Sequence, residues 1–146
     1  MRKISNIICI VLIIAFAVFL AAGWSGFPEE VPTHFNLSGS ADSFGPKTTL
    51  LRDLAVMAGL FILLAVVESF PRIWNIPVEV TEDNKDDILS AIYRMFAVVK
   101  TSIVLICAIS SFMCIYQGFP VWPMYLLIVI MLFTIVFTIF RVLKLQ

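Results

Sequence analysis

The chain has 146 residues and a formal net charge of zero, with 61% hydrophobic and only 14% charged residues. Soluble domains contain roughly 45–50% apolar residues, so this composition indicates a membrane protein. A neutral chain without a basic cluster offers no electrostatic surface for nucleic acid, so we expect no nucleic-acid partner. We expect one membrane domain over residues 1–146, with the lipid bilayer as its main partner.

Four apolar runs set the predicted architecture. A run of about 20 residues spans a bilayer, because a helix rises roughly 1.5 Å per residue across about 30 Å of hydrocarbon. Backbone groups in lipid need hydrogen bonds within their own segment, which favours helices. The sequence therefore predicts an all-α integral membrane bundle of four transmembrane helices at about residues 4–24, 50–70, 82–116 and 121–140.

The first apolar run resembles a signal peptide in one respect, because the basic residues Arg2 and Lys3 precede it. Its apolar core is longer than the roughly 7–15 residues of a signal peptide. We expect it to be retained as a helix.

Lys and Arg residues predict the orientation, because cytoplasmic loops carry an excess of them. One side of the predicted bundle has seven such residues and the other has only Lys47 and Arg52. The seven are Arg2, Lys3, Arg72, Lys85, Arg94, Arg141 and Lys144. We therefore expect a multi-pass protein of the bacterial cell membrane, with both termini cytoplasmic and the loop 25–49 outside.

The outer loop 25–49 is rich in turn-forming residues. The residue before a proline avoids the helical region, so Val31–Phe35 is predicted to be extended. Ser38-Gly39 is predicted to form a turn. We expect the loop to be an ordered cap over the helix ends.

Within this cap, His34 and Asp42 are the expected polar pins, and Phe35 and Phe44 are the expected apolar anchors. His34 is the only histidine in the chain. With Asp42 and Glu29 or Glu30 it could hold a metal ion, and with a nearby serine it could act as a general base.

We favour a structural role, in which His34, Asn36 and Asp42 hydrogen-bond the loop itself. The sequence accordingly predicts no catalytic residue, no metal site and no cofactor, although metal binding by the loop stays an open alternative.

The third helix is predicted to begin after Thr81. A threonine followed by Glu82 and Asp83 is typical of an N-cap and first turn, where the helix dipole favours anions. The helix should then continue to about Tyr116.

Glu68 and Lys100 are charged residues inside predicted membrane helices. Charged side chains in lipid are costly and usually pair with each other or mark a polar path. Antiparallel neighbours would bring these two residues to a similar depth, so an ion pair is one hypothesis. The other hypothesis is that the two side chains extend separately to the membrane–water interface.

The loop motif resembles a known family. Trp24 is followed by Pro28-Glu29-Glu30-Val31-Pro32-Thr33-His34-Phe35-Asn36, and then by Gly39, Asp42, Phe44, Gly45 and Lys47. This pattern resembles the bacterial membrane family catalogued as domain-of-unknown-function 1648, and Ala41 stands where the family commonly has a proline. The same module is similar to the N-terminal half of the Sdp immunity protein, which protects cells from their own secreted toxin.

The resemblance implies binding residues in the loop motif: His34, Phe35, Asn36, Gly39, Asp42, Phe44, Gly45 and Lys47. It implies a non-enzymatic protein for toxin immunity or for sensing a peptide toxin or another membrane protein. The alternative is a small transporter subunit or a membrane-embedded enzyme that uses Glu68, Lys100 or His34. Mid-helix positions are almost entirely apolar, which favours the first hypothesis, since transporters usually carry polar groups near mid-membrane.

Overall fold

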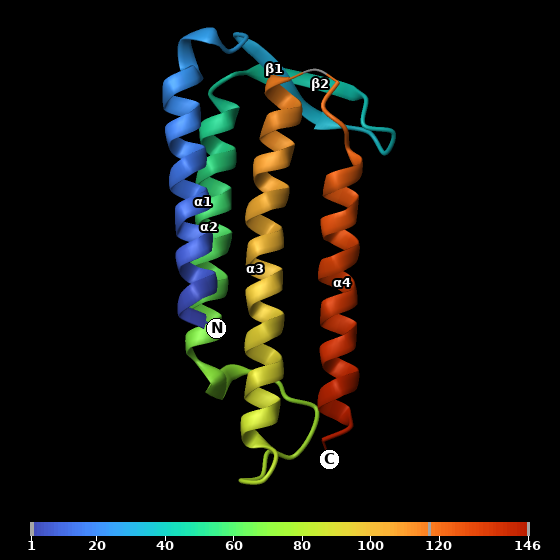
Figure 1. Cartoon of the computed structure of the whole chain (residues 1–146). Helices are drawn as coiled ribbons and strands as arrows, with labels where there is room; N and C mark the ends of the chain where they lie inside the picture. Colours follow the sequence, from blue (N-terminus) through green and yellow to red (C-terminus); the bar gives the residue numbers. More distant parts are fainter. Residues whose placement is uncertain (1, 117, 146) are drawn as a thin grey trace.

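The computed structural model describes residues 2–116 and 118–145. It contains four long helices, α1 (Arg2–Gly23), α2 (Thr49–Ser69), α3 (Lys85–Ile115) and α4 (Trp122–Leu143). All four are long and apolar enough to cross a membrane. They run lengthwise beside one another, and the two chain ends lie at the same end of the bundle (Figure 1).

The prediction of an all-α protein is wrong in the loop between α1 and α2. This loop contains the strands β1 (Glu30–Phe35) and β2 (Ala41–Pro46), which pair as an antiparallel hairpin across the opposite end of the bundle (Figure 1). Prolines keep the segment extended, and its backbone groups then find partners across the hairpin. The predicted extended segment Val31–Phe35 and the turn near Gly39 are confirmed.

The helix bounds differ most from the predicted ones at the start of α3 and at the end of α4, by three residues each. Thr81 is not its N-cap, because the helix begins at Lys85 and Asn84 takes the cap position. The Asn84 amide is engaged elsewhere: its Oδ1 accepts from the backbone N–H of Thr81 at 2.9 Å, and its Nδ2 donates to the carbonyls of Glu79 and Leu145. Asn84 therefore closes the turn before α3 onto the end of the chain.

α3 is the central helix, because it packs against α1, α2 and α4. α1 and α2 also contact each other, whereas α4 stands on the other side of α3 (Figure 1). With 31 residues α3 is about 46 Å long, well beyond the about 30 Å of a hydrocarbon core. Its first turns therefore extend past the ends of α1 and α2, and α4 accompanies them.

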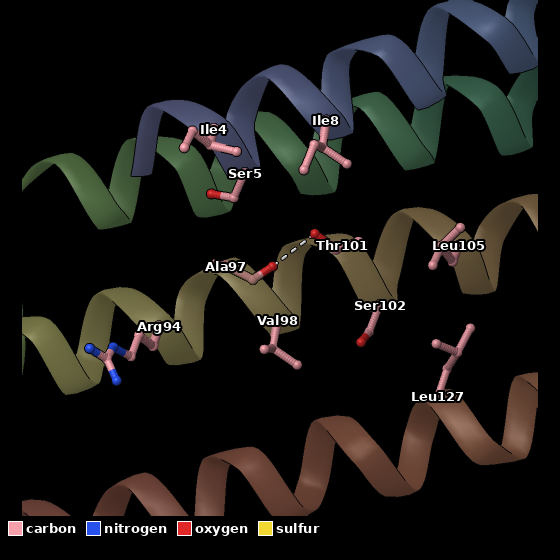
Figure 2. A pocket seen from close by; sticks show the side chains of 10 residues that line it. All are labelled: Ile4, Ser5, Ile8, Arg94, Ala97, Val98, Thr101, Ser102, Leu105 and Leu127. Atoms are coloured by element: carbon pink, nitrogen blue, oxygen red, sulfur yellow. Dashed lines mark hydrogen bonds between the residues drawn. The ribbon is translucent and has the colours of Figure 1, made fainter. Parts of the chain in front are cut away.

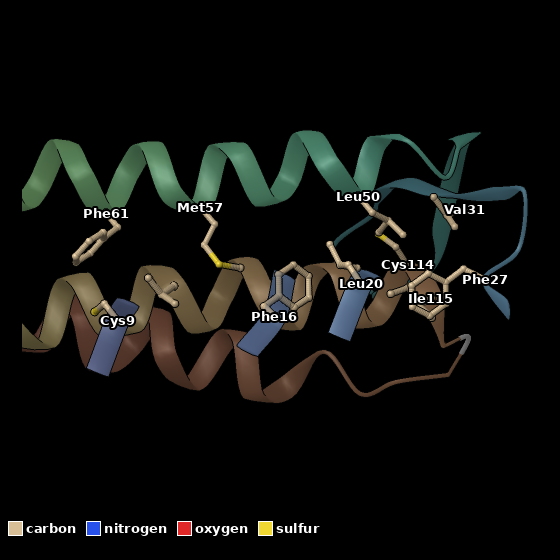
Figure 3. Packing of buried hydrophobic residues seen from close by; sticks show 11 residues of the cluster. Cys9, Phe16, Leu20, Phe27, Val31, Leu50, Met57, Phe61, Cys114 and Ile115 are labelled. Carbon is tan, nitrogen blue, oxygen red and sulfur yellow. The ribbon is translucent and has the colours of Figure 1, made fainter. Parts of the chain in front are cut away.

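Two apolar clusters hold the bundle. The first lies among α1, α2, α3 and the hairpin, with Leu20, Val31 and Leu50 almost fully buried (Figure 3). The second joins the start of α3 to the end of α4 through Ile88 and Val142. The first cluster matters for function because Val31 ties the hairpin directly to the helix ends.

Candidate functional site

The turn of the hairpin is organised by Asn36. Its side-chain Oδ1 accepts hydrogen bonds from the backbone N–H groups of Ser38 and Ser40, both at 3.0 Å, and from the Ser38 hydroxyl at 2.6 Å. The Asn36 carbonyl also accepts from the N–H of Gly39. The hydrogen-bonding capacity of the Asn36 side-chain oxygen is therefore used within the turn, as is common for short polar side chains in turns.

Gly39 permits the turn and lets it approach α4. Its φ is +81°, a region that costs other L-residues roughly 1–2 kcal/mol. A side-chain Cβ at this position would lie 3.3 Å from Val121. Near it, the hydroxyl of Tyr125 donates to the carbonyl of Leu37 at 2.7 Å. These contacts fix the tip of the hairpin to the start of α4.

Lys47 fixes the other end of the hairpin. Its Nζ donates to Glu29 Oε1 at 2.9 Å and to the carbonyl of Trp24 at 3.2 Å, and it lies 5.3 Å from the centre of the Trp24 ring. The Lys47 side chain is mostly buried by these contacts. Lys47 therefore joins the end of α1 to the start of α2, and Glu29 is engaged with it.

Close packing between the strands explains why a glycine occupies position 45. A Cβ there would lie 3.0 Å from the methyl group of Thr33 on the facing strand. The Thr33 hydroxyl in turn donates to the Ser43 hydroxyl at 3.2 Å. Gly45 thus serves the fit between β1 and β2.

His34 and Asp42 face each other across the hairpin. His34 Nδ1 lies 2.5 Å from Asp42 Oδ1, and the two side chains remain 68% and 46% exposed. Within residues 2–116 and 118–145, no three His, Cys, Asp or Glu side chains gather as metal ligands would. The pair is an exposed polar contact that links the two strands.

The two predicted apolar anchors behave differently. Phe35 packs against the buried cluster under the hairpin, as expected. Phe44 does not, since it is 56% exposed, and Leu37 at the tip is 92% exposed. The reason is the pairing of the strands, which turns most of β2 toward the surroundings while Val31 and Pro32 face the helices.

A cavity of about 280 Å³ opens between the hairpin, the end of α3 and residues 118–119 of the α3–α4 connection. That volume far exceeds the roughly 30 Å³ that one water molecule occupies in the liquid. Both strands, the turn and the α3–α4 connection contribute to its wall, which consists of Pro32, Phe35, Gly39, Ser40, Ala41, Phe44, Met113, Gly118 and Phe119. Five of the residues singled out in the sequence motif thus lie at the hairpin face or its cavity: His34, Phe35, Gly39, Asp42 and Phe44.

Glu68 and Lys100 meet inside the bundle, near its opposite end. Lys100 Nζ lies 2.5 Å from Glu68 Oε2, and both side chains are 0% exposed. Lys100 also donates to the side-chain carbonyl of Asn6 on α1. The cluster thus connects α1, α2 and α3 through polar groups, far from the hairpin.

Asn6 is not among the predicted site residues, although it is the amide residue within an otherwise apolar run. Tyr125 is not among them either, because it looks like an ordinary aromatic residue at a membrane interface. In both cases the contact joins residues distant in the sequence, so only the packing of the helices reveals it.

The segment that builds the hairpin matches a known protein family. Residues 10–58 match the family model described as Domain of unknown function (DUF1648). The chain thus carries a DUF1648 segment. The matched residues run from α1 through the hairpin into α2 and include the loop motif, and the family description assigns no activity. No curated protein and no solved structure matches the chain.

Proposed function

We propose that this DUF1648 protein is a non-enzymatic membrane receptor whose hairpin binds an extended segment of a peptide toxin or of another membrane protein. The proposal rests on one observation: the hairpin is held in place by several contacts, and yet it keeps apolar side chains exposed. The hairpin is fastened at Lys47, at Tyr125 and through Val31, yet Leu37 and Phe44 stay exposed. Apolar side chains exposed on an immobilised hairpin are typical of a binding surface.

The outer edge of β2 suits an extended peptide. The sheet has two strands among the described residues, and β1 packs against α3, so β2 offers the accessible edge. A peptide that adds as a third strand gains backbone hydrogen bonds from the edge and specificity from side-chain pockets. Phe44 and the cavity of about 280 Å³ beside it would accept an apolar side chain of that peptide.

Toxin immunity is the specific role we favour, by analogy with the Sdp immunity protein that the loop motif resembles. It requires the hairpin to face outward, and the seven-to-two distribution of Lys and Arg supports this orientation. A reporter fused after Gln146 should be active only in its cytoplasmic form. Activity of an exported reporter at that position would refute the orientation.

A transporter subunit is the second candidate. Glu68 Oε1 is buried and has no hydrogen-bond partner within the described part of the chain, so it could bind a transported cation or proton. Lys100 opposes this function because its positive charge already neutralises Glu68. Uptake or efflux that disappears in Glu68→Gln but persists in Phe44→Ser would favour this candidate over the receptor.

The receptor proposal is tested in cells of a sensitive bacterium challenged with secreted peptide toxins. The wild-type protein should protect against at least one of them, and the variants Leu37→Ser and Phe44→Ser should lose most of the protection while inserting normally. A photoreactive residue at position 44 should crosslink to the labelled toxin. The matched control is position 62, since Ile62 is an exposed apolar residue of α2 far along the helix from the hairpin. Equal protection by the serine variants, or equal crosslinking from position 62, would contradict the proposal.

A further inference from the structure

A long groove runs along α3 between α1 and α4. It encloses about 690 Å³ and opens sideways, because α1 and α4 pack on α3 without closing over it. Figure 2 shows Ile4 and Ile8 of α1 on one side, Leu127 of α4 on the other, and Val98 and Leu105 of α3 between them. The groove lies within the membrane-spanning part of the bundle, where its natural surroundings are lipid chains.

The hydroxyl groups beside the groove are mostly engaged within their own helices. Thr101 donates to the carbonyl of Ala97 at 2.9 Å (Figure 2), and Ser5 donates to the carbonyl of Arg2 at 3.1 Å. The wall that remains is dominated by aliphatic side chains, which favour an apolar occupant.

The length of the groove matches one leaflet. Arg94 and Leu105 mark its two ends on α3, and they are about 16 Å apart along the axis at roughly 1.5 Å per residue. Half of a hydrocarbon core of about 30 Å is about 15 Å. One acyl chain that enters from the end near Arg94 would therefore fill the groove to mid-membrane.

Arg94 supplies the charge at the open end. Its side chain is exposed and makes no ion pair with residues 2–116 or 118–145. A second cavity of about 510 Å³ is lined by Tyr93, the residue before Arg94 in α3, and by Arg2, Ser90 and Asp86. A guanidinium group binds a phosphate through two parallel hydrogen bonds, so the place is chemically suited to a phosphodiester.

We propose that this groove binds one phospholipid molecule as a specific site. Its phosphate binds Arg94, with Arg2 nearby, and one acyl chain lies between α1 and α4 along α3. Asp86 and Ser90 accept hydrogen bonds from the hydroxyl or ammonium group of the headgroup beyond the phosphate. A helix from a second copy is the less suitable occupant, because it would have to bring an anionic group to the depth of Arg94.

The test uses the full-length protein in nanodiscs of phosphatidylcholine with a small fraction of phosphatidylglycerol that carries a photoactivatable acyl chain. Crosslinks should concentrate on the peptides that contain Leu105 and Leu127. Arg94→Gln should reduce them about fivefold to tenfold, since it removes the charge-assisted contact with the phosphate. Ala97→Phe, which fills the groove, should abolish them without removing Arg94.

Arg72→Gln is the matched control, because Arg72 is an exposed arginine outside both cavities. It should leave the crosslinks unchanged. Equal labelling in Arg94→Gln and wild type would overturn the proposal, because it would mean non-specific contact with bulk lipid. Crosslinks that join two copies of the chain through the groove, in place of lipid, would overturn it as well.

Discussion

The buried contact between Glu68 and Lys100 yields the sharpest prediction for stability. Both side chains are 0% exposed and their charged atoms lie 2.5 Å apart. Removing one partner strands the other charge away from water, which is expected to cost about 3–5 kcal/mol of unfolding free energy. Glu68→Gln should therefore destabilise the protein by about that amount, and Lys100→Met by a similar one.

The double variant separates pairing from simple loss of packing. Once Lys100→Met has removed the stranded ammonium, the further change Glu68→Gln costs much less than it does alone. The double variant should therefore be more stable than the sum of the single losses predicts, with a coupling of at least about 2 kcal/mol, within the range of direct contacts.

Thermal and denaturant unfolding of the purified protein in one detergent would measure these losses. The control is Glu82→Gln, because Glu82 pairs with Lys85 at 3.5 Å in an exposed position where a salt bridge contributes at most about 1 kcal/mol. Strictly additive losses for Glu68→Gln and Lys100→Met would refute the reasoning, as would a loss no larger than that of the control.

The remaining predictions concern the hairpin and the turn before α3. Gly39→Ala should destabilise the docked hairpin by about 1–2 kcal/mol, because the φ of Gly39 is +81°. Gly26→Ala is the control and should be nearly neutral, because a Cβ at Gly26 would meet open space. Hydrogen exchange of residues 36–40 would measure the effect of both changes on the hairpin. Tyr125→Phe should cost about 1 kcal/mol through the lost hydrogen bond to the Leu37 carbonyl, and faster proteolysis at the tip would report it, while unchanged cleavage would contradict it. Asn84→Ala should speed exchange of residues 79–85 and leave the hairpin unchanged, since its three hydrogen bonds all lie at the other end of the bundle.

Composition and apolar run length alone determined the four long helices. Those signals are local: lipid-compatible helices satisfy their own backbone hydrogen bonds, so each can be recognised without its neighbours. The prolines likewise predicted the extended start of the loop, and the motif from Trp24 to Lys47 led to the family that residues 10–58 match.

The tertiary structure decided which distant residues meet. The strand pairing turned Phe44 outward and Phe35 inward, and the position of α4 gave Tyr125 its contact with the hairpin. The packing of α1 and α4 on opposite sides of α3 created the groove that ends at Arg94. These features depend on contacts between segments far apart in the sequence, and no local pattern of residues encodes the relative position of two helices that each satisfy their own backbone.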